Sequence, residues 1–165
     1  MLVAALTIYA QINTNIWGLT VGKSTKQQVK NVLRNKGYSV EVLYDGTIAI
    51  APKSGVYFGG QLWERTYFAF YKNTLSQVAF QTDNESSFNN VYSVFYVLSN
   101  KLKEKYGRYY KFSEEDKYFY FDDGNNTVSI SIYNSDVSSS IIYVSLSYYN
   151  NILDSKRTQS ETDEL

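Results

Sequence analysis

Apolar residues at helical spacing predict a first helix near the amino terminus. Its apolar stripe consists of Val29, Val32 and Leu33, and basic residues lie on the opposite side of the helix. Ser24 is placed to cap this helix, and Gln27, three residues later, would complete a capping box. Gly37 is expected to end the helix as the glycine after its last turn.

A second helix is predicted from about Phe88 to Tyr106, ended by Gly107. Its apolar positions have the same spacing and are Val91, Phe95, Leu98 and Leu102. No segment has the roughly 20 consecutive apolar residues that a membrane-spanning helix needs, so no transmembrane segment is expected.

The rest of the chain alternates with a period of two, which is typical of strands with one buried face. In the first half, "YSVEVLY" and "TIAIA" flank the hairpin signal Asp45-Gly46, and "GVYFGG", "QLWERTYFAFY" and "LSQVAFQ" follow. In the second half, "KYFYF", "TVSISIY" and "IIYVSLSYY" are separated by turn residues. The order is therefore helix then strands, twice.

This order predicts an α+β fold in a single domain over residues 11–150. Two α-β-β-β repeats, about residues 18–82 and 86–150, would form one antiparallel sheet with both helices packed on one face. Neither half has enough apolar surface to be comfortably stable alone, so the halves should share a core. Residues 151–165 are polar and are expected to form a disordered tail.

Strand alternation divides the residues between the two faces of the sheet. The face expected to pack on the helices carries Phe68, Phe70, Val78, Phe80, Phe119, Phe121, Val128, Ile130, Ile132, Ile142, Val144 and Leu146. The other face is rich in tyrosine, serine and glutamine and nearly free of charge. It carries Tyr67, Tyr71, Gln77, Gln81, Tyr118, Tyr120, Ser129, Ser131, Tyr133, Tyr143, Ser145 and Ser147.

Two interpretations of this second face remain open. Tyrosine favours strands, so the face can be ordinary exposed sheet. Alternatively it is a recognition surface, because tyrosine offers rigid, amphipathic contact area and is enriched at interfaces. Trp63 follows two glycines and is either a core residue or a platform for a sugar ring. The candidate partner-binding residues are Trp63, Tyr67, Tyr71, Tyr118, Tyr120, Tyr133 and Tyr143.

The first ten residues, "MLVAALTIYA", resemble the end of a secretory signal peptide with cleavage after Ala10. The alternative is a buried first strand. The first interpretation predicts a soluble protein exported to the periplasm or the extracellular space.

Composition narrows the possible chemistry. The chain has no cysteine and no histidine, which excludes disulfides, Ser-His-Asp and Cys-His catalysis and the usual zinc ligands. Its formal net charge is zero, so no nucleic-acid partner is expected. We expect no metal and no cofactor.

Two stretches suggest chemistry that their spacing does not support. "GLTVGKST" resembles a phosphate-binding P-loop, but only three residues separate Gly18 from Gly22 where four are required, so no nucleotide is expected. The acidic residues near Asp122 and Asp123 do not alternate as in an EF-hand loop. They suit solvated turns, or else a pair of carboxylates in a hydrolase.

The stretch "WGLTVGKSTKQQVKNVL", with its later "GY", resembles the start of a small repeat. This repeat is found in the beta-lactamase inhibitor protein and in small outer-membrane assembly lipoproteins, and the matching positions are Gly22, Ser24, Gln27, Gln28, Val29 and Gly37. The whole chain is also similar to short secreted Gram-negative proteins of unknown function. The second half, "SSFNNVYSVF", lacks the Gly-x-Ser start, and the cysteine of the lipid-anchored members is absent. The resemblance implies a helix-on-sheet repeat and binding through the open sheet face, and it assigns no functional residue.

We therefore predict a non-enzymatic, exported binding module that engages a protein or glycan partner through the Tyr/Ser/Gln-rich face. The alternatives are a carboxylate-dependent hydrolase of polysaccharide or cell-wall material, which would depend on Asp122 or Asp123, and a structural envelope protein.

Overall fold

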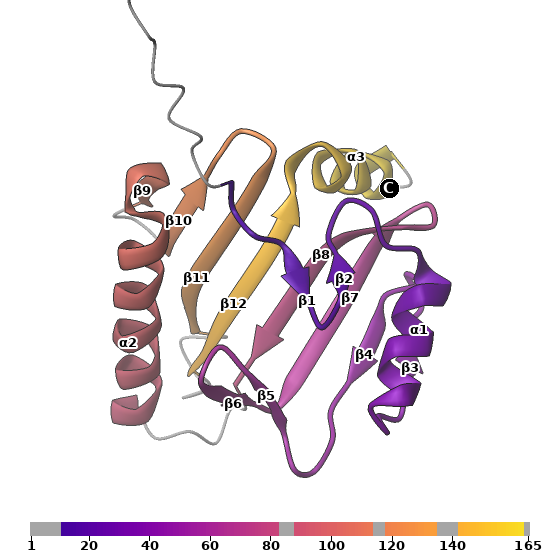
Figure 1. Ribbon diagram of the computed structural model, residues 1–165, viewed down its shortest axis with the longest axis horizontal. Helices are drawn as coiled ribbons and strands as arrows, with labels where there is room; N and C mark the ends of the chain where they lie inside the picture. The colour runs from indigo at the N-terminus through magenta and orange to yellow at the C-terminus, as the bar shows by residue number, and fades with distance from the viewer. Residues whose placement is uncertain (1–10, 83–87, 114–117, 135–141, 164–165) are drawn as a thin grey trace, which may run out of the picture.

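The computed structural model describes residues 11–82, 88–113, 118–134 and 142–163 (Figure 1). Within these residues it contains three α-helices, one eight-stranded antiparallel sheet and two small two-stranded sheets. The predicted α+β class is confirmed. The proposed signal segment, residues 1–10, lies outside the described residues.

The large sheet is built from two four-stranded meanders joined side by side. The first comprises β3 (Glu41–Val42), β4 (Ile48–Ile50), β7 (Arg65–Tyr71) and β8 (Thr74–Gln81). The second comprises β9 (Tyr110–Ser113), β10 (Tyr118–Asp122), β11 (Asn126–Asn134) and β12 (Ile142–Asn150). The strand order is β3-β4-β7-β8-β12-β11-β10-β9, so β8 and β12 form the seam between the halves. The single antiparallel sheet is as predicted, but each half contributes four strands to it rather than three.

Helix α1 (Lys26–Asn35) begins one residue later than predicted. Thr25, not Ser24, is the N-cap, and its capping box is closed by Gln28 rather than Gln27. Ser24 is held to the neighbouring strand, because its carbonyl accepts the Leu75 N–H at 2.8 Å while its hydroxyl accepts the Thr20 N–H. Gly37 ends the helix as predicted, with φ of 79°, and this conformation lets the Tyr38 N–H bond the Leu33 carbonyl.

Helix α2 (Phe88–Tyr106) has the predicted bounds. The four predicted apolar residues, Val91, Phe95, Leu98 and Leu102, are all buried. Gly107 does not adopt a left-handed φ; it opens a short 3₁₀ turn, Gly107–Tyr109, that leads into β9. No helix in the described ranges is both long and apolar enough to cross a membrane.

The core lies between the sheet and its helix-side layer. The predicted core residues that are fully buried there are Phe68, Val78, Phe80, Phe121, Val128, Ile130, Val144 and Leu146. Phe70, Phe119 and Ile132 are partly buried against this cluster. Two hairpins complete the layer between α1 and α2 (Figure 1). The first pairs β1 (Asn15–Ile16) with β2 (Leu19–Thr20), and the second pairs β5 (Val56–Phe58) with β6 (Gln61–Trp63).

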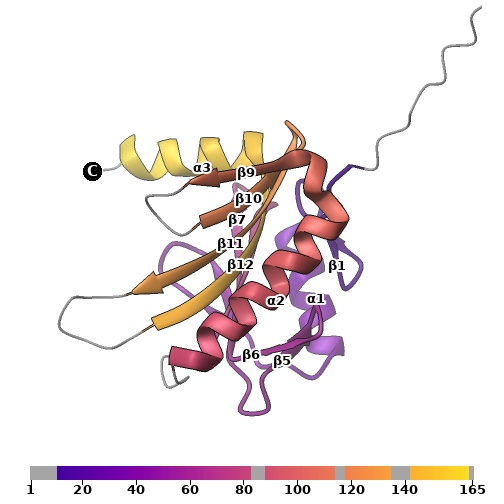
Figure 2. The ribbon, with the colours of Figure 1, turned by 90° about the vertical axis from the view of Figure 1, so that its left-hand side faces the viewer.

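The prediction of a disordered carboxyl-terminal tail is wrong. Residues Asn151–Asp163 form helix α3, which packs on β7, β8 and β12. Asn150 caps it, because the Asn150 Oδ1 accepts the Leu153 N–H at 3.1 Å. Figure 2 shows α3 on the opposite side of the sheet from α1 and α2. The face that the sequence left open is therefore partly covered.

Candidate functional site

The strand register arranges the second face of the sheet in cross-strand rows. One row crosses all eight strands and consists of Glu41, Ala49, Tyr67, Ala79, Ser147, Ser129, Tyr120 and Lys111. The next row consists of Arg65, Gln81, Ser145, Ser131, Tyr118 and Ser113. Within these two rows, ionisable side chains other than tyrosine stand only at the ends, so the strands themselves place no formal charge in the middle of the face.

The middle of the face is a floor of small side chains. We call this the serine floor, and it consists of Ala79, Ser129, Ser131, Ser145 and Ser147. Each has a relative exposure between 2% and 6%, although it points away from the core. Tyrosines flank the floor along the first row, because the register places Tyr67 beside Ala79 and Tyr120 beside Ser129. The Ser145 and Ser147 hydroxyls lie 3.3 Å apart and share a hydrogen bond.

The structure brings most of the predicted tyrosines to this face. Tyr67, Tyr120 and Tyr143 are partly buried around the serine floor. Tyr71 lies at the end of the β7–β8 hairpin, where the Lys72 ammonium is 5.5 Å from its ring centroid. The register places Tyr118 opposite Ser131 and Tyr133 opposite Tyr143, so both backbone positions belong to the same face.

Trp63 does not belong to this face, and its prediction as a partner-binding residue is wrong. The residue has no exposed surface, packs 5.8 Å from the Phe80 ring centroid, and donates its Nε1–H to the Phe58 carbonyl at 2.9 Å. As one continuous strand, "QLWERTYFAFY" would give Trp63 the parity of Tyr67. The strand breaks at Glu64, so β6 turns away with β5 and carries Trp63 into the core.

Trp17 is also a core element. It adopts a φ of 55° and is partly buried. Four aromatic rings lie within 6.4 Å of its ring centroid, those of Tyr38, Phe58, Phe68 and Phe80. Trp63 is therefore a core residue rather than a platform for a sugar ring, and Trp17 packs against the same core.

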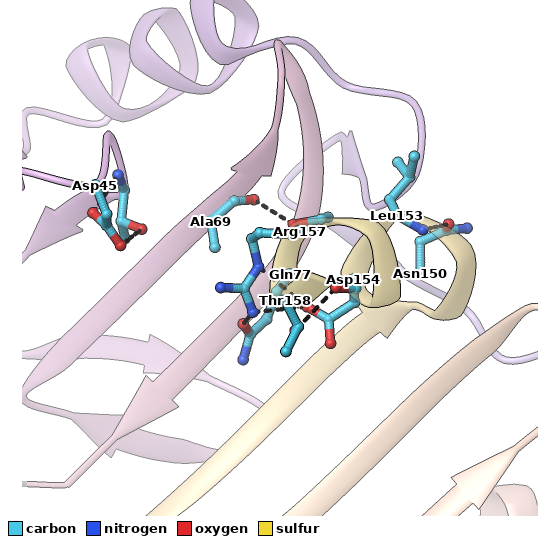
Figure 3. Close-up of polar contacts among 10 residues, drawn as sticks. Asp45, Ala69, Gln77, Asn150, Leu153, Asp154, Arg157 and Thr158 are labelled. Carbon is cyan, nitrogen blue, oxygen red and sulfur yellow. Dashed lines mark hydrogen bonds and ion pairs between the residues drawn. The ribbon is translucent and has the colours of Figure 1, made fainter. Parts of the chain in front are cut away.

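Helix α3 forms one wall of a hollow on the second face, with a volume of about 300 Å³. Its floor and sides come from Tyr67, Ala69, Gln77, Ala79 and Gln81, and the β3–β4 turn adds Leu43, Asp45 and Thr47. Arg157 reaches from α3 toward the sheet (Figure 3). Its Nη2 donates to the Gln77 Oε1 at 3.2 Å and to the Asp154 Oδ1 at 2.9 Å.

Sequence reasoning missed Arg157 because it treated the last fifteen residues as a tail. Three signals were available. Asn150 is a favoured N-cap residue, Asp154 suits the first turn of a helix, and Asp154 and Arg157 have the spacing of an ion pair on one helix face.

The two carboxylates that a hydrolase would need hold turns together in this structure. Asp123 accepts the N–H groups of Ile12, Asn125 and Asn126, at 2.7 to 3.0 Å. Partial burial acts to raise the pKa of Asp122. The Gly124 N–H, the Asn151 amide and the Lys111 ammonium outweigh that effect and hold the pKa below its ordinary value. A general acid in a hydrolase requires the opposite shift.

The remaining predictions concern bound groups. Among the described residues, no three acidic side chains come together as a group that would hold a metal ion. The P-loop-like stretch supplies the turn and cap described above for α1. Comparison of the chain with protein-family models, curated proteins and solved structures finds no significant match. The resemblance to the inhibitor and lipoprotein repeat therefore stays a prediction.

Proposed function

We propose that this chain is an exported, non-enzymatic binding module for a neutral glycan. The ligand would lie on the second face of the sheet, across β8, β12, β11 and β10. The observation that carries the proposal is the serine floor, an uncharged strip of small side chains that has a tyrosine on either side.

The chemistry of this strip suits a sugar better than an apolar peptide. Serine hydroxyls and the nearby Gln77 and Gln81 carboxamides both donate and accept hydrogen bonds, as sugar hydroxyls do. Tyrosine rings present an apolar surface with a polar tip, so Tyr67 and Tyr120 can stack on the C–H face of a sugar ring. The rows carry no ionisable side chain other than tyrosine along β12, β11 and β10, and Arg157 beside β8 is paired with Asp154, which together favour a neutral ligand over a uronate or sulfated chain.

The non-enzymatic part of the proposal is supported by Asp122 and Asp123. Their oxygens are occupied by turn and helix-cap contacts, and Asp122 stays ionised near neutral pH. Export is supported by the apolar start of the chain, as argued from the sequence.

The test combines one triple variant with a matched control. Tyr67, Tyr120 and Tyr143 are changed together to Ser, and the control changes the exposed Tyr44, Tyr57 and Tyr96 to Ser. Affinity electrophoresis against a panel of neutral and acidic polysaccharides should show retardation by a neutral member for the native chain and the control. The variant that lacks Tyr67, Tyr120 and Tyr143 should no longer be retarded by that polysaccharide.

A thermal unfolding scan of the same proteins separates binding from stability. The binding variant should lose only a few degrees of Tm, because its three side chains are partly exposed. A collapse of the Tm would make these tyrosines structural. Retardation by acidic polysaccharides only, or by no polysaccharide, would overturn the glycan proposal.

A further inference from the structure

A second hollow, larger than the one beside α3, lies where four segments of the chain meet. It has a volume of about 560 Å³ and lies between the amino-terminal segment, the loop before α1, the β10–β11 turn and the end of β12 (Figure 1). We call it the amide-lined hollow, because its lining includes Asn13, Asn15, Asn125, Asn126 and Asn150. Lys23 is the one charged residue among its described lining residues.

The walls of the amide-lined hollow are fixed by the backbone. The Val21 N–H bonds the Thr14 carbonyl at 3.2 Å, and the Gly22 N–H bonds the Leu75 carbonyl at 2.8 Å. Gly22 has a φ of 91°, and a Cβ placed there would lie 2.8 Å from the Asn150 Nδ2. The positive φ favours glycine at this position, and the absence of a Cβ lets the Asn150 amide pack against the backbone of the loop.

The hydrogen bonds within the lining decide which polar groups are left for a ligand. Two side-chain oxygens of the lining hold backbone N–H groups: the Asn13 Oδ1 accepts the Asn15 N–H at 2.9 Å, and the Asn150 Oδ1 accepts the Leu153 N–H at 3.1 Å. The Asn15 Oδ1 likewise accepts the Gly18 N–H. Since backbone donors fix these oxygens, the orientation of each carboxamide is settled, and the Nδ2 groups of Asn13 and Asn150 remain as donors.

These donors and the exposed Lys23 call for a ligand rich in acceptors. Lys23 forms no ion pair with any described residue, so its charge is available. The Asp123 carboxylate lies directly behind the lining, bonded to the N–H groups of Ile12, Asn125 and Asn126. With one cation at the rim and the partly buried Asp123 carboxylate behind, a singly charged ligand is favoured over a doubly charged phosphate.

We infer that the amide-lined hollow binds a hydroxylated monocarboxylate of the size of one or two sugar units, such as a hexuronic acid. Its carboxylate would take charge-assisted hydrogen bonds from Lys23 and the Asn13 amide, and its hydroxyl oxygens would accept from Asn150. This site is separate from the serine floor and does not depend on the proposed glycan face.

The test is isothermal titration calorimetry of the full chain with sodium D-glucuronate, D-glucose and inorganic phosphate. Glucuronate should show saturable binding, and glucose and phosphate should each bind at least tenfold more weakly. Asn13→Asp keeps the oxygen that accepts the Asn15 N–H but replaces the donor with a second anion. It should weaken glucuronate binding at least tenfold with little change in Tm.

Lys23→Gln is a second variant whose side chain is exposed, so it should fold even if Asn13→Asp does not. It should also weaken glucuronate binding, whereas Lys53→Gln, an exposed lysine outside the hollow, should leave it unchanged. Equal binding of glucose, tighter binding of phosphate, no saturable glucuronate binding, or full binding by both hollow variants would each overturn the inference. The Tyr67, Tyr120 and Tyr143 variant should bind glucuronate normally, which separates this site from the sheet face.

Discussion

Replacing Trp63 with alanine should be among the most damaging single changes to this fold. The side chain has no exposed surface, and its indole N–H satisfies the Phe58 carbonyl at 2.9 Å. Truncating a buried tryptophan costs about 3–5 kcal/mol, and leaving a buried carbonyl without its donor adds about 1 kcal/mol. A domain of this size is stable by roughly 5–15 kcal/mol, so Trp63→Ala should remove a third of the total or more.

The measurement is urea unfolding followed by far-ultraviolet circular dichroism, because removing Trp63 leaves Trp17 as the only tryptophan and alters the fluorescence signal. With a slope of about 2 kcal/mol per molar urea, the midpoint should fall by about 2–3 M. Trp63→Phe retains most of the ring and loses the hydrogen bond, so its loss should be intermediate, about 1–2 kcal/mol.

Tyr44→Ala is the matched control, since it also removes an aromatic ring but from a fully exposed side chain. It should leave the free energy of unfolding within about 0.5 kcal/mol of the native value. If Trp63→Ala unfolded at nearly the same urea concentration as Tyr44→Ala, Trp63 would be exposed in solution and its assignment to the core would be wrong.

Two further predictions concern alkaline stability and α3. Burial raises the pKa of Tyr148, and the neighbouring Tyr106 adds to this, so the folded state keeps a phenol proton that the unfolded chain releases above about pH 10. Tyr148 therefore leaves the free energy of unfolding unchanged below about pH 10 and lowers it above that pH, by up to about 1.4 kcal/mol per pH unit. Tyr148→Phe should make the urea midpoint less dependent on pH between pH 9 and 11. Tyr44→Phe, the control, should leave that pH dependence unchanged. Arg157→Ala removes the contacts to Gln77 and Asp154, so hydrogen exchange of the α3 amides should accelerate several-fold with less than about 1 kcal/mol of global destabilisation. Lys156→Ala, which changes an exposed neighbour on the same helix, should leave the exchange of the α3 amides unchanged. If the α3 amides exchanged at the same rate in both variants, Arg157 would not hold α3 in place.

Periodicity was enough to predict the parts of the fold that bury apolar side chains in regular elements. The bounds of α2 and the buried sides of β7, β8, β11 and β12 followed from it, because a sheet with one covered face forces strict alternation. The same argument located the serine floor, since Ser129, Ser131, Ser145 and Ser147 alternate with core residues.

The failures arose where contacts between distant residues decide the outcome. Helix α3 has few apolar residues, and it is positioned by the Arg157–Gln77 contact across a long stretch of sequence. Trp63 was misplaced because one residue, Glu64, breaks the strand and reverses the parity before it. Neither event changes the local pattern of apolar and polar residues, so periodicity alone does not reveal it, although the cap and charge signals at Asn150, Asp154 and Arg157 pointed to α3.

The seam between β8 and β12 also constrains how the chain is made. Phe80 pairs with Leu146, so the seam edge of β8 has no partner until nearly the whole second half has been synthesised. At ~5–20 residues per second, that edge stays open for several seconds on the ribosome. An unpaired strand that ends in "SQVAFQ" is a template for another nascent copy. Slow translation of the second half should therefore favour intermolecular strand pairing, and faster delivery of β12, or a chaperone that covers β8, should suppress it.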